Sequence, residues 1–151
     1  MKLKSDQAKI DIANIGQDFY NRGWMYGTSG NLSARVEDGD HGLRFAITAS
    51  GVDKGALKPE DILIHSPHGP VQSKSGLRPS AETSIHTAVY DAREDAGAVL
   101  HVHTPESTVY SMSSSVRGTP ALFPISGYEM IKGLGIWEEG AEVEMPVFEN
   151  Y

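Results

Sequence analysis

The stretch GAVLHVHTP, Gly97 to Pro105, combines a strand pattern with the start of a helix. Its apolar residues Ala98, Val99 and Leu100 predict a buried strand that continues to His103. Thr104 and Pro105 then suit the first turn of a helix, where proline is favoured. A buried strand that leads directly into a helix is typical of folds that mix the two kinds of element.

Helices and strands alternate along the rest of the chain. Apolar spacing predicts helices at 5–23, 80–93, 104–113 and 129–134, and strands at 32–36, 43–48, 61–65, 98–103, 121–125 and 143–147. In the second helix we expect Ile85, Ala88 and Val89 to face inward. The turn-rich EDGDHG at 37–42 predicts a hairpin, so an α/β fold with a mixed sheet is favoured over an all-parallel one.

The bulk composition is that of a globular protein. The 151 residues fit a single domain, 1–151, with 39% hydrophobic and 22% charged residues. The net charge of −7 argues against a nucleic-acid partner, because phosphate backbones attract basic surfaces. No apolar run is long enough for a membrane span, and no signal-peptide core is visible. We therefore expect a cytoplasmic protein that binds neither nucleic acid nor membrane.

His101 and His103 are the first candidates for chemistry. Residues two apart on a strand point to the same face, so the two imidazoles lie side by side. Such a pair suits two nitrogen ligands of one Zn²⁺ ion. The alternative is a pair of half-exposed histidines at the end of a strand.

Two glutamates are candidate acid/base groups. Glu82, in PSAETSIH, falls near a helix start, where it is either a helix-end charge or a carboxylate aimed at a metal or substrate. Glu129, in ISGYEMIKGLG, borders an apolar run of Met130, Ile131 and Leu134 that predicts a buried short helix. A carboxylate in that setting is suited to proton transfer, and the alternative is a surface or capping residue.

Small-residue loops form the third group of candidates. GTSGN (Gly27 to Asn31) and ASG (Ala49 to Gly51) offer amides and hydroxyls that could cradle a phosphate. Ser80 and nearby amides could bind an anion at the start of the helix that follows. Each loop alone is weak evidence, because such residues more often form an ordinary turn.

Taken in order, TSGNLS, ASGVDKGALKPEDIL, RPSAETSIHTAVY, GAVLHVHTP and GYEMIKGLG resemble the class II aldolase/adducin superfamily. The resemblance runs from about Ile10 to Tyr151. SGVDKG and EMIKG point, within the superfamily, to the branch that dehydrates methylthioribulose 1-phosphate. The implied fold has α/β/α layers around a mixed, mainly antiparallel central sheet.

The resemblance also implies a site. One Zn²⁺ would be held by three histidines, of which two match His101 and His103. Phosphate contacts would come from Ser29, Gly30, Asn31, Ser50, Gly51 and Ser80. Glu129 would be the acid/base, and Glu82 matches a catalytic glutamate of the aldolases. The third zinc histidine belongs to a C-terminal RGHG-type segment with no match here, so we expect a C-terminally truncated chain.

Three functions remain open at this stage. The first is a zinc-dependent hydro-lyase that forms 2,3-diketo-5-methylthiopentyl 1-phosphate in methionine salvage, acting as a homotetramer on a small sugar phosphate. The second is a sugar-phosphate aldolase or epimerase of the same superfamily. The third is a non-catalytic domain like the adducin head, or an inactive fragment.

Overall fold

A computed structural model describes residues 4–37, 42–72, 76–114 and 121–147. The chain divides into two compact units, Met1–Pro105 and Glu106–Tyr151. The described strands form one sheet of five and one of two. The expectation of one domain over 1–151 stays a prediction.

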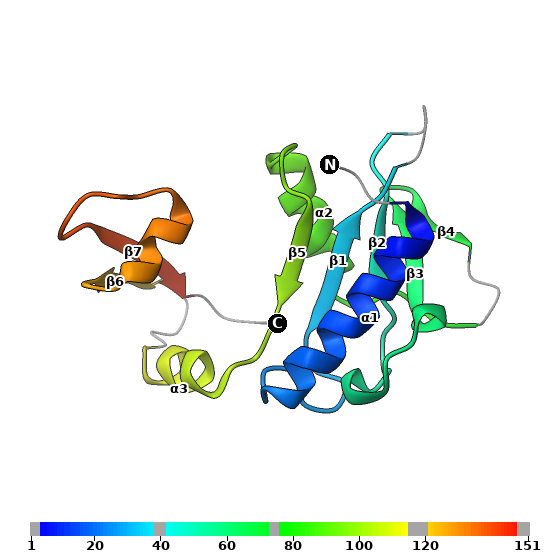
Figure 1. The fold of residues 1–151 in the computed structure, drawn as a ribbon, viewed down its shortest axis with the longest axis horizontal. Helices are drawn as coiled ribbons and strands as arrows, with labels where there is room; N and C mark the ends of the chain where they lie inside the picture. Colours follow the sequence, from blue (N-terminus) through cyan, green and yellow to red (C-terminus); the bar gives the residue numbers. More distant parts are fainter. Residues whose placement is uncertain (1–3, 38–41, 73–75, 115–120, 148–151) are drawn as a thin grey trace. The chain divides into compact units, whose positions relative to one another are not determined.

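The first unit is built on a five-stranded sheet in the order β4-β3-β2-β1-β5, and every described pair in it is antiparallel (Figure 1). Its elements are α1 (Ser5–Asn21), β1 (Asn31–Arg35), β2 (Phe45–Thr48), η1 (Lys54–Ala56), η2 (Pro59–Asp61), β3 (Ile62–Ser66), β4 (Gly69–Gln72), α2 (Thr83–Ala92) and β5 (Ala98–His101). The expected hairpin between β1 and β2 is confirmed. The short strand β4 was not predicted, because its sequence GPVQ has a weak strand signal.

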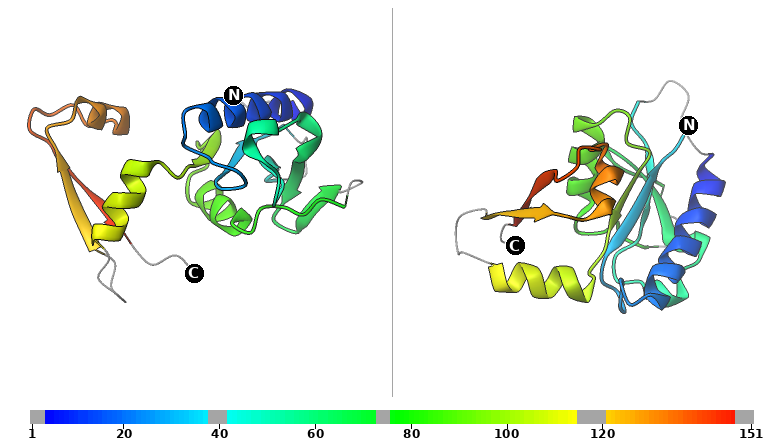
Figure 2. Two further views of the ribbon diagram at one scale, coloured as in Figure 1. Left: turned by 90° about the horizontal axis from the view of Figure 1, so that it is seen from below. Right: turned by 60° about the vertical axis from the view of Figure 1, so that its left-hand side comes forward.

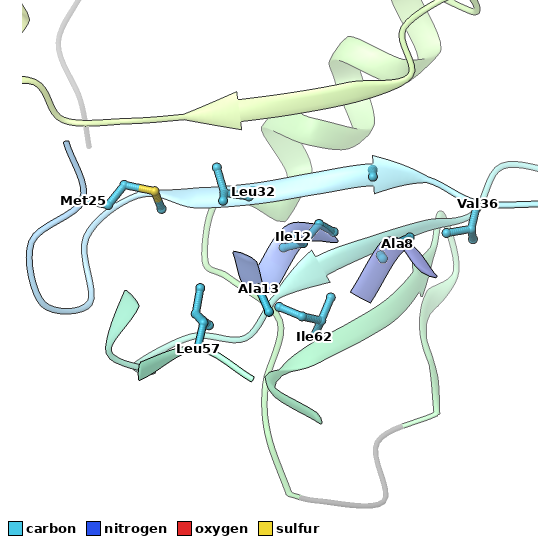
Figure 3. Close-up of a cluster of buried hydrophobic side chains, with 10 residues drawn as sticks. Ala8, Ile12, Ala13, Met25, Leu32, Val36, Leu57 and Ile62 are labelled. Carbon is cyan, nitrogen blue, oxygen red and sulfur yellow. The ribbon is translucent and has the colours of Figure 1, made fainter. Parts of the chain in front are cut away.

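One face of the sheet packs against α1. Strand side chains alternate between faces, so Leu32 and Ala34 of β1 lie on the same side as Ala46 of β2. They join Ala8, Ile12 and Ala13 of α1 in a core that also holds Met25, Val36, Leu57 and Ile62 (Figure 3). This apolar layer fixes the end of α1, and hence the loop that leads into β1.

The opposite face packs against α2, as the left view of Figure 2 shows. Phe45, Ile47 and Tyr90 form a second buried cluster there. The two helices therefore lie on opposite faces of the antiparallel sheet, as expected for α/β/α layers. The expected inward face of α2 is wrong: Ile85 is 54% exposed, and the buried residues are Thr83, His86 and Tyr90. Polar contacts between these residues and β1 set this rotation of the helix.

β5 is an edge strand and not the buried strand predicted from Ala98 to His103. Among the described residues it pairs only with β1, with Asn31 opposite His101. Ala98 and Leu100 are exposed, and only Val99 packs against the second cluster. The apolar run predicted burial on both faces of β5. Only the face that carries Val99 is covered by packed side chains, and the face that carries Ala98 and Leu100 is exposed.

The second unit holds α3 (Pro105–Ser114, which begins at the unit boundary), β6 (Ala121–Ser126), η3 (Glu129–Leu134) and β7 (Glu142–Val147). β6 and β7 pair antiparallel, with Ile125 opposite Val143. The Tyr110 ring meets the Phe123 ring edge-on at 5.1 Å, so α3 packs on β6. Across the described residues, no helix has the length and apolar character needed to cross a membrane.

Candidate functional site

The histidine pair, His101 and His103, lies where β5 ends. The two ring centroids are 4.6 Å apart and tilted by 48°. The His103 amide donates to the Trp24 carbonyl at 2.8 Å, which ties the strand end to the loop after α1. Burial and the neighbouring His101 lower the pKa of His103, so its imidazole is neutral at pH 7. The alternation read from the sequence therefore places two imidazoles together.

Glu82 joins this pair from the start of α2. It occupies the N-cap position but makes no capping bond to its own helix. Its Oε2 instead lies 2.7 Å from His101 Nδ1 and accepts from Asn31 Nδ2 at 2.5 Å. Of the two interpretations of Glu82, the structure favours the one that aims the carboxylate at the histidine pair.

The charges around Glu82 favour its ionised form. Burial raises the pKa of Glu82, but the Asn31 hydrogen bond and the attraction of His101 outweigh it and hold the pKa below its ordinary value. A carboxylate that accepts from His101 Nδ1 requires the proton of that imidazole to be on Nδ1. In the neutral form of the ring the Nε2 lone pair is then free, which is the arrangement of a metal-binding histidine held by a carboxylate.

The donor set of this cluster fits part of a zinc site. Zinc binds neutral imidazoles, and a carboxylate behind one of them is a common partner of such a ligand. Within the described ranges, no group of three or more His, Cys, Asp or Glu side chains is arranged to hold a metal ion. These residues could therefore supply two ligands, and do not by themselves complete a site.

Three loops meet beside this cluster. The first is GTSGN, which precedes β1; the second is ASG, which follows β2; the third is the segment 78–82, which leads into α2. β1 runs antiparallel to β2 and β5, so its start lies at the same sheet edge as their ends (Figure 1). The Ser50 amide donates to the Arg78 carbonyl at 2.8 Å, which joins the second loop to the third.

Glycine is required where the first loop approaches the histidine strand. Gly30 has a φ of 72°, and a Cβ built there would lie 2.8 Å from the His101 carbonyl oxygen. Any side chain would push GTSGN away from β5. Gly30 thus acts through its lack of a side chain, whatever its amide binds.

Some polar groups of the candidate serines already make hydrogen bonds within the fold. Ser29 Oγ donates to the Tyr26 carbonyl at 2.6 Å. Ser80 Oγ accepts from the Glu82 amide at 3.4 Å, and the Ser80 carbonyl accepts from Thr83. Ser50 and Gly51 are exposed at their turn, with Gly51 at a φ of 74°. The loops therefore gather as expected, and phosphate binding by them stays a prediction.

Asn31 differs from these loop residues because both polar atoms of its side chain are hydrogen-bonded to other side chains. It is 4% exposed, and its Oδ1 accepts from His86 Nε2 at 2.5 Å while Nδ2 donates to Glu82. The sequence singled out Asn31 for phosphate, whereas in the structure its amide joins Glu82 to His86. His86 was not chosen from the sequence, although its four-residue spacing from Glu82 was a readable signal.

Lys54 is a second residue that the sequence interpretation missed. Its side chain is buried, and Nζ donates to the carbonyls of Thr28 and Val52 at 3.0 Å each. Its backbone amide donates to the Gly27 carbonyl at 2.7 Å. Burial lowers the pKa of Lys54, and Asp53 only partly opposes this. Lys54 thus ties the GTSGN loop to Val52, which directly follows the ASG loop, through one buried ammonium.

Glu129 lies in the second unit, at the start of η3. The short helix is present as predicted, but its burial is not: Met130 is 87% and Leu134 62% exposed, and only Ile131 is buried. The Glu129 side chain is 86% exposed and pairs with Lys132 at 3.2 Å. The apolar run was misleading because a six-residue 3₁₀ turn presents its side chains on all sides.

A cavity of about 500 Å³ lies between α1 and the strands β1 and β5. Ile12, Ile15, Leu32 and Leu100 line it, and none of the candidate site residues does. The chemistry-bearing side chains therefore gather outside this apolar space.

Comparison with known proteins finds relatives that bear the same name. A methylthioribulose-1-phosphate dehydratase from Bacillus pumilus (strain SAFR-032) is 44% identical over 141 residues, 93% of this chain and 64% of that protein. Its counterpart from Persephonella marina (strain DSM 14350 / EX-H1) is 42% identical over 146 residues, 96% of this chain and 65% of that protein. The chain thus spans less than two thirds of the length of these relatives.

Solved structures give the same fold. YgbL from Klebsiella pneumoniae superposes with a TM-score of 0.64 at 26% identity, covering 77% of this chain and 52% of that one. The L-fuculose-1-phosphate aldolase from Thermus thermophilus superposes with a TM-score of 0.54 at 30% identity, covering 70% of this chain and 52% of that one.

The family pattern named "Class II Aldolase and Adducin N-terminal domain" matches residues 10–151, which include most of the first unit and all of the second. The expected class II aldolase-like α/β fold is confirmed by this match and by the superpositions. The chain belongs to the class II aldolase and adducin N-terminal domain family.

Proposed function

We propose that this protein dehydrates 5-methylthioribulose 1-phosphate to 2,3-diketo-5-methylthiopentyl 1-phosphate, a hydro-lyase step of methionine salvage. The observation that carries the proposal is the contact of Glu82 with His101, beside His103, where three small-residue loops meet. Relatives at 44% and 42% identity that bear the dehydratase name support this substrate over other sugar phosphates.

The metal of this proposal is Zn²⁺, one per subunit. His101 and His103 would supply two imidazole ligands, and a third ligand would come from outside the described residues. When bound, such an ion supplies a Lewis acid for the C2 carbonyl of a ketose phosphate. The side chains of this chain supply the proton transfer and the grip on the phosphate.

Dehydration requires a base for the C3 proton and an acid for the departing C4 hydroxyl. We assign the acid/base role to Glu129, which stands in EMIKG and is exposed to an incoming substrate. Glu82 is the second candidate. Its Oε1 has no hydrogen bond to any described residue, so this oxygen is available to a ligand while Oε2 holds His101 and Asn31.

The phosphate of the substrate would be held by the GTSGN and ASG loops and the turn at Ser80. The Ser50 hydroxyl and the Gly51 backbone lie at an exposed turn and suit this role. The Ser29 hydroxyl and the amides of Ser29 and Ser50 already donate to backbone carbonyls, so they would have to exchange these bonds for the phosphate. The buried ammonium of Lys54, which is bonded to the Thr28 carbonyl of the first loop and to the Val52 carbonyl just after the second, adds positive charge behind them. Fixing the phosphate positions the reacting carbons at the histidine pair.

The setting of the protein is part of the same proposal. We place it in the cytoplasm as a homotetramer that acts on a small molecule. The tetramer is part of the proposal because sites of this family usually form between neighbouring subunits.

A second candidate function is cleavage of a sugar phosphate by aldolase chemistry. It is favoured by the superposition on an L-fuculose-1-phosphate aldolase and by the position of Glu82. A non-catalytic domain is the third, and it predicts no turnover.

One assay separates the three. The protein, expressed from its full reading frame and loaded with Zn²⁺, is incubated with 5-methylthioribulose 1-phosphate, and the products are followed by ³¹P and ¹H NMR. We expect the diketone phosphate and water. Dihydroxyacetone phosphate with methylthioacetaldehyde would establish the aldolase instead, and unchanged substrate would establish a non-catalytic domain.

A further inference from the structure

A continuous row of polar side chains lies buried between β1 and α2, behind Glu82. The row consists of Tyr90, Ser33, His86 and Asn31, with exposed fractions of 1%, 0%, 1% and 4%. Tyr90 Oη is 2.8 Å from Ser33 Oγ, and Ser33 Oγ is 2.6 Å from His86 Nδ1. His86 Nε2 is 2.5 Å from Asn31 Oδ1, and Asn31 Nδ2 reaches Glu82. The row therefore ends at the candidate site.

The spacing of the residues explains why they meet. Glu82, His86 and Tyr90 are four apart on a helix, which places them on one face of α2. Asn31, Ser33 and Arg35 are two apart on a strand, which places them on one face of β1. The two series interdigitate, and the Arg35 guanidinium lies over the Tyr90 ring at 4.8 Å. This interdigitation explains the rotation of α2 that exposes Ile85.

The hydrogen bonds of the row have a single consistent direction. The Glu82 carboxylate only accepts, so Asn31 presents its amide nitrogen to Glu82 and its oxygen to His86. His86 must therefore carry its proton on Nε2, which leaves Nδ1 to accept from the Ser33 hydroxyl. Ser33 in turn accepts from Tyr90. Each donor has one acceptor, and the direction runs from Tyr90 to Glu82.

We infer that His86 is a positioning residue of this site: its Nε2–H fixes the Asn31 amide so that Asn31 donates to Glu82 and holds the carboxylate against His101. A flipped Asn31 would set its oxygen against the carboxylate of Glu82, two acceptors at hydrogen-bond distance. A residue without a donor at the His86 position would leave the Asn31 amide held by its contact with Glu82 alone, instead of by two bonds.

The charge state of His86 agrees with this geometry. Burial is the main cause that lowers the pKa of His86 to about 4, and His101 adds to it while Glu82 opposes it. The imidazole is neutral at pH 7, as a side chain that both donates and accepts must be. A charged His86 would donate from both nitrogens and reverse the bond to Ser33.

The tautomer is tested first, on the metal-free protein at pH 7, by long-range ¹H–¹⁵N NMR of the histidine rings. His86 is assigned by its loss in His86→Gln. We expect a neutral ring protonated on Nε2, and an Asn31 side-chain amide that exchanges slowly with water. A ring protonated on Nδ1 would overturn the inference, whatever the protein catalyses.

A matched pair of variants tests the positioning role. His86→Gln keeps an amide N–H near the Nε2 position, whereas His86→Leu fills similar space without a donor. Slow exchange of the Asn31 amide should persist in His86→Gln and be lost in His86→Leu. Equal exchange in the two variants would contradict the inference. If His86→Leu does not fold, Ser33→Ala, which removes the donor to Nδ1, replaces it. Because Asn31 Oδ1 still accepts from Nε2, the ring should stay protonated on Nε2 in this variant. A ring that moves its proton to Nδ1 would contradict the directed row.

The kinetic test of the His86 variants rests on the proposed function. For dehydration of the sugar phosphate, His86→Leu should lower kcat about 10–100-fold with little change in KM, the usual scale for groups that orient a metal ligand or its partner. His86→Gln should stay within a few-fold of the wild type. Wild-type kcat in His86→Leu would overturn the role of His86. Absence of turnover in the wild type would overturn the proposed function and leave the NMR result to decide this inference.

Discussion

At the scale of single residues, the site depends on which carboxylate moves the proton. Glu82 is bound to two protein groups through Oε2, whereas Glu129 is exposed and bonded to Lys132. Glu129→Gln removes the basic carboxylate but keeps the size and shape of the side chain. It should bind zinc normally and lose turnover by about 100-fold or more, within the range for general acid–base groups.

The control for this prediction is Glu82→Gln, assayed for both zinc content and kcat. Because Glu82 holds His101, its loss should weaken zinc binding as well as turnover. Near-wild-type activity in Glu129→Gln would transfer the acid/base role to Glu82.

His86 also makes the stability of the fold depend on pH. Its pKa of about 4 in the folded chain lies below the ordinary value of 6.5, so the unfolded chain binds more protons between these values. Stability is therefore complete above pH 6.5 and falls as the pH drops toward 4, by up to about 3 kcal/mol. The charged and titratable groups around it are Glu82 and Tyr90 on α2, Arg35 on β1 and His101 on β5.

Urea unfolding between about pH 8 and pH 4.5 measures this effect. The wild type should lose more free energy of unfolding over that range than His86→Gln, which does not titrate. Parallel pH profiles of the two proteins would show that His86 does not contribute.

At the scale of elements, the loops depend on the buried Lys54. Its ammonium bonds Thr28 and Val52, and Lys54→Met keeps the length of the side chain while leaving both carbonyls without this donor. The variant should be destabilised by about 2 kcal/mol, since unsatisfied buried acceptors cost roughly 1–3 kcal/mol each and the loss of a buried charge offsets part of that.

The same substitution should raise KM for the sugar phosphate more than it lowers kcat, because it loosens the loops and not the histidine pair. Urea unfolding and steady-state kinetics check the two effects. The matched control is Lys58→Met, which lies four residues on and is exposed, and which should change neither quantity. An unchanged KM in Lys54→Met would show that the two loops do not hold the substrate.

The elements themselves were largely predictable from the sequence. The hairpin of β1 and β2, the helices α1 and α2 and the short helix at Glu129 follow from apolar spacing and turn residues. The faces of these elements were harder to predict. α2 was expected to bury Ile85, but it buries His86 because the hydrogen bonds with Asn31 and Ser33 set its rotation.

The site was predictable in its parts and not in its connections. His101, His103 and Glu82 were identified by residue type and spacing, and the structure brings them together. The Asn31 contact with both Glu82 and His86, and the Lys54 contact with two loops, depend on how distant segments align. A single sequence carries no direct signal for that alignment.

At the scale of the whole molecule, the family pattern covers both units, while the chain spans 64% of the length of a dehydratase relative. The proposed dehydration requires the histidine pair to be part of a working metal centre. The complete protein, expressed from its full reading frame, is therefore expected to hold zinc through His101 and His103.

The most direct measurement is zinc content by mass spectrometry, taken with the dehydration rate, for the wild type, His101→Ala and His103→Ala. We expect one Zn²⁺ per chain in the wild type, and loss of zinc and of turnover together in both variants, with folding shown intact by circular dichroism. Full zinc content in either variant, or a wild type that binds no zinc when the ion is supplied, would contradict this expectation.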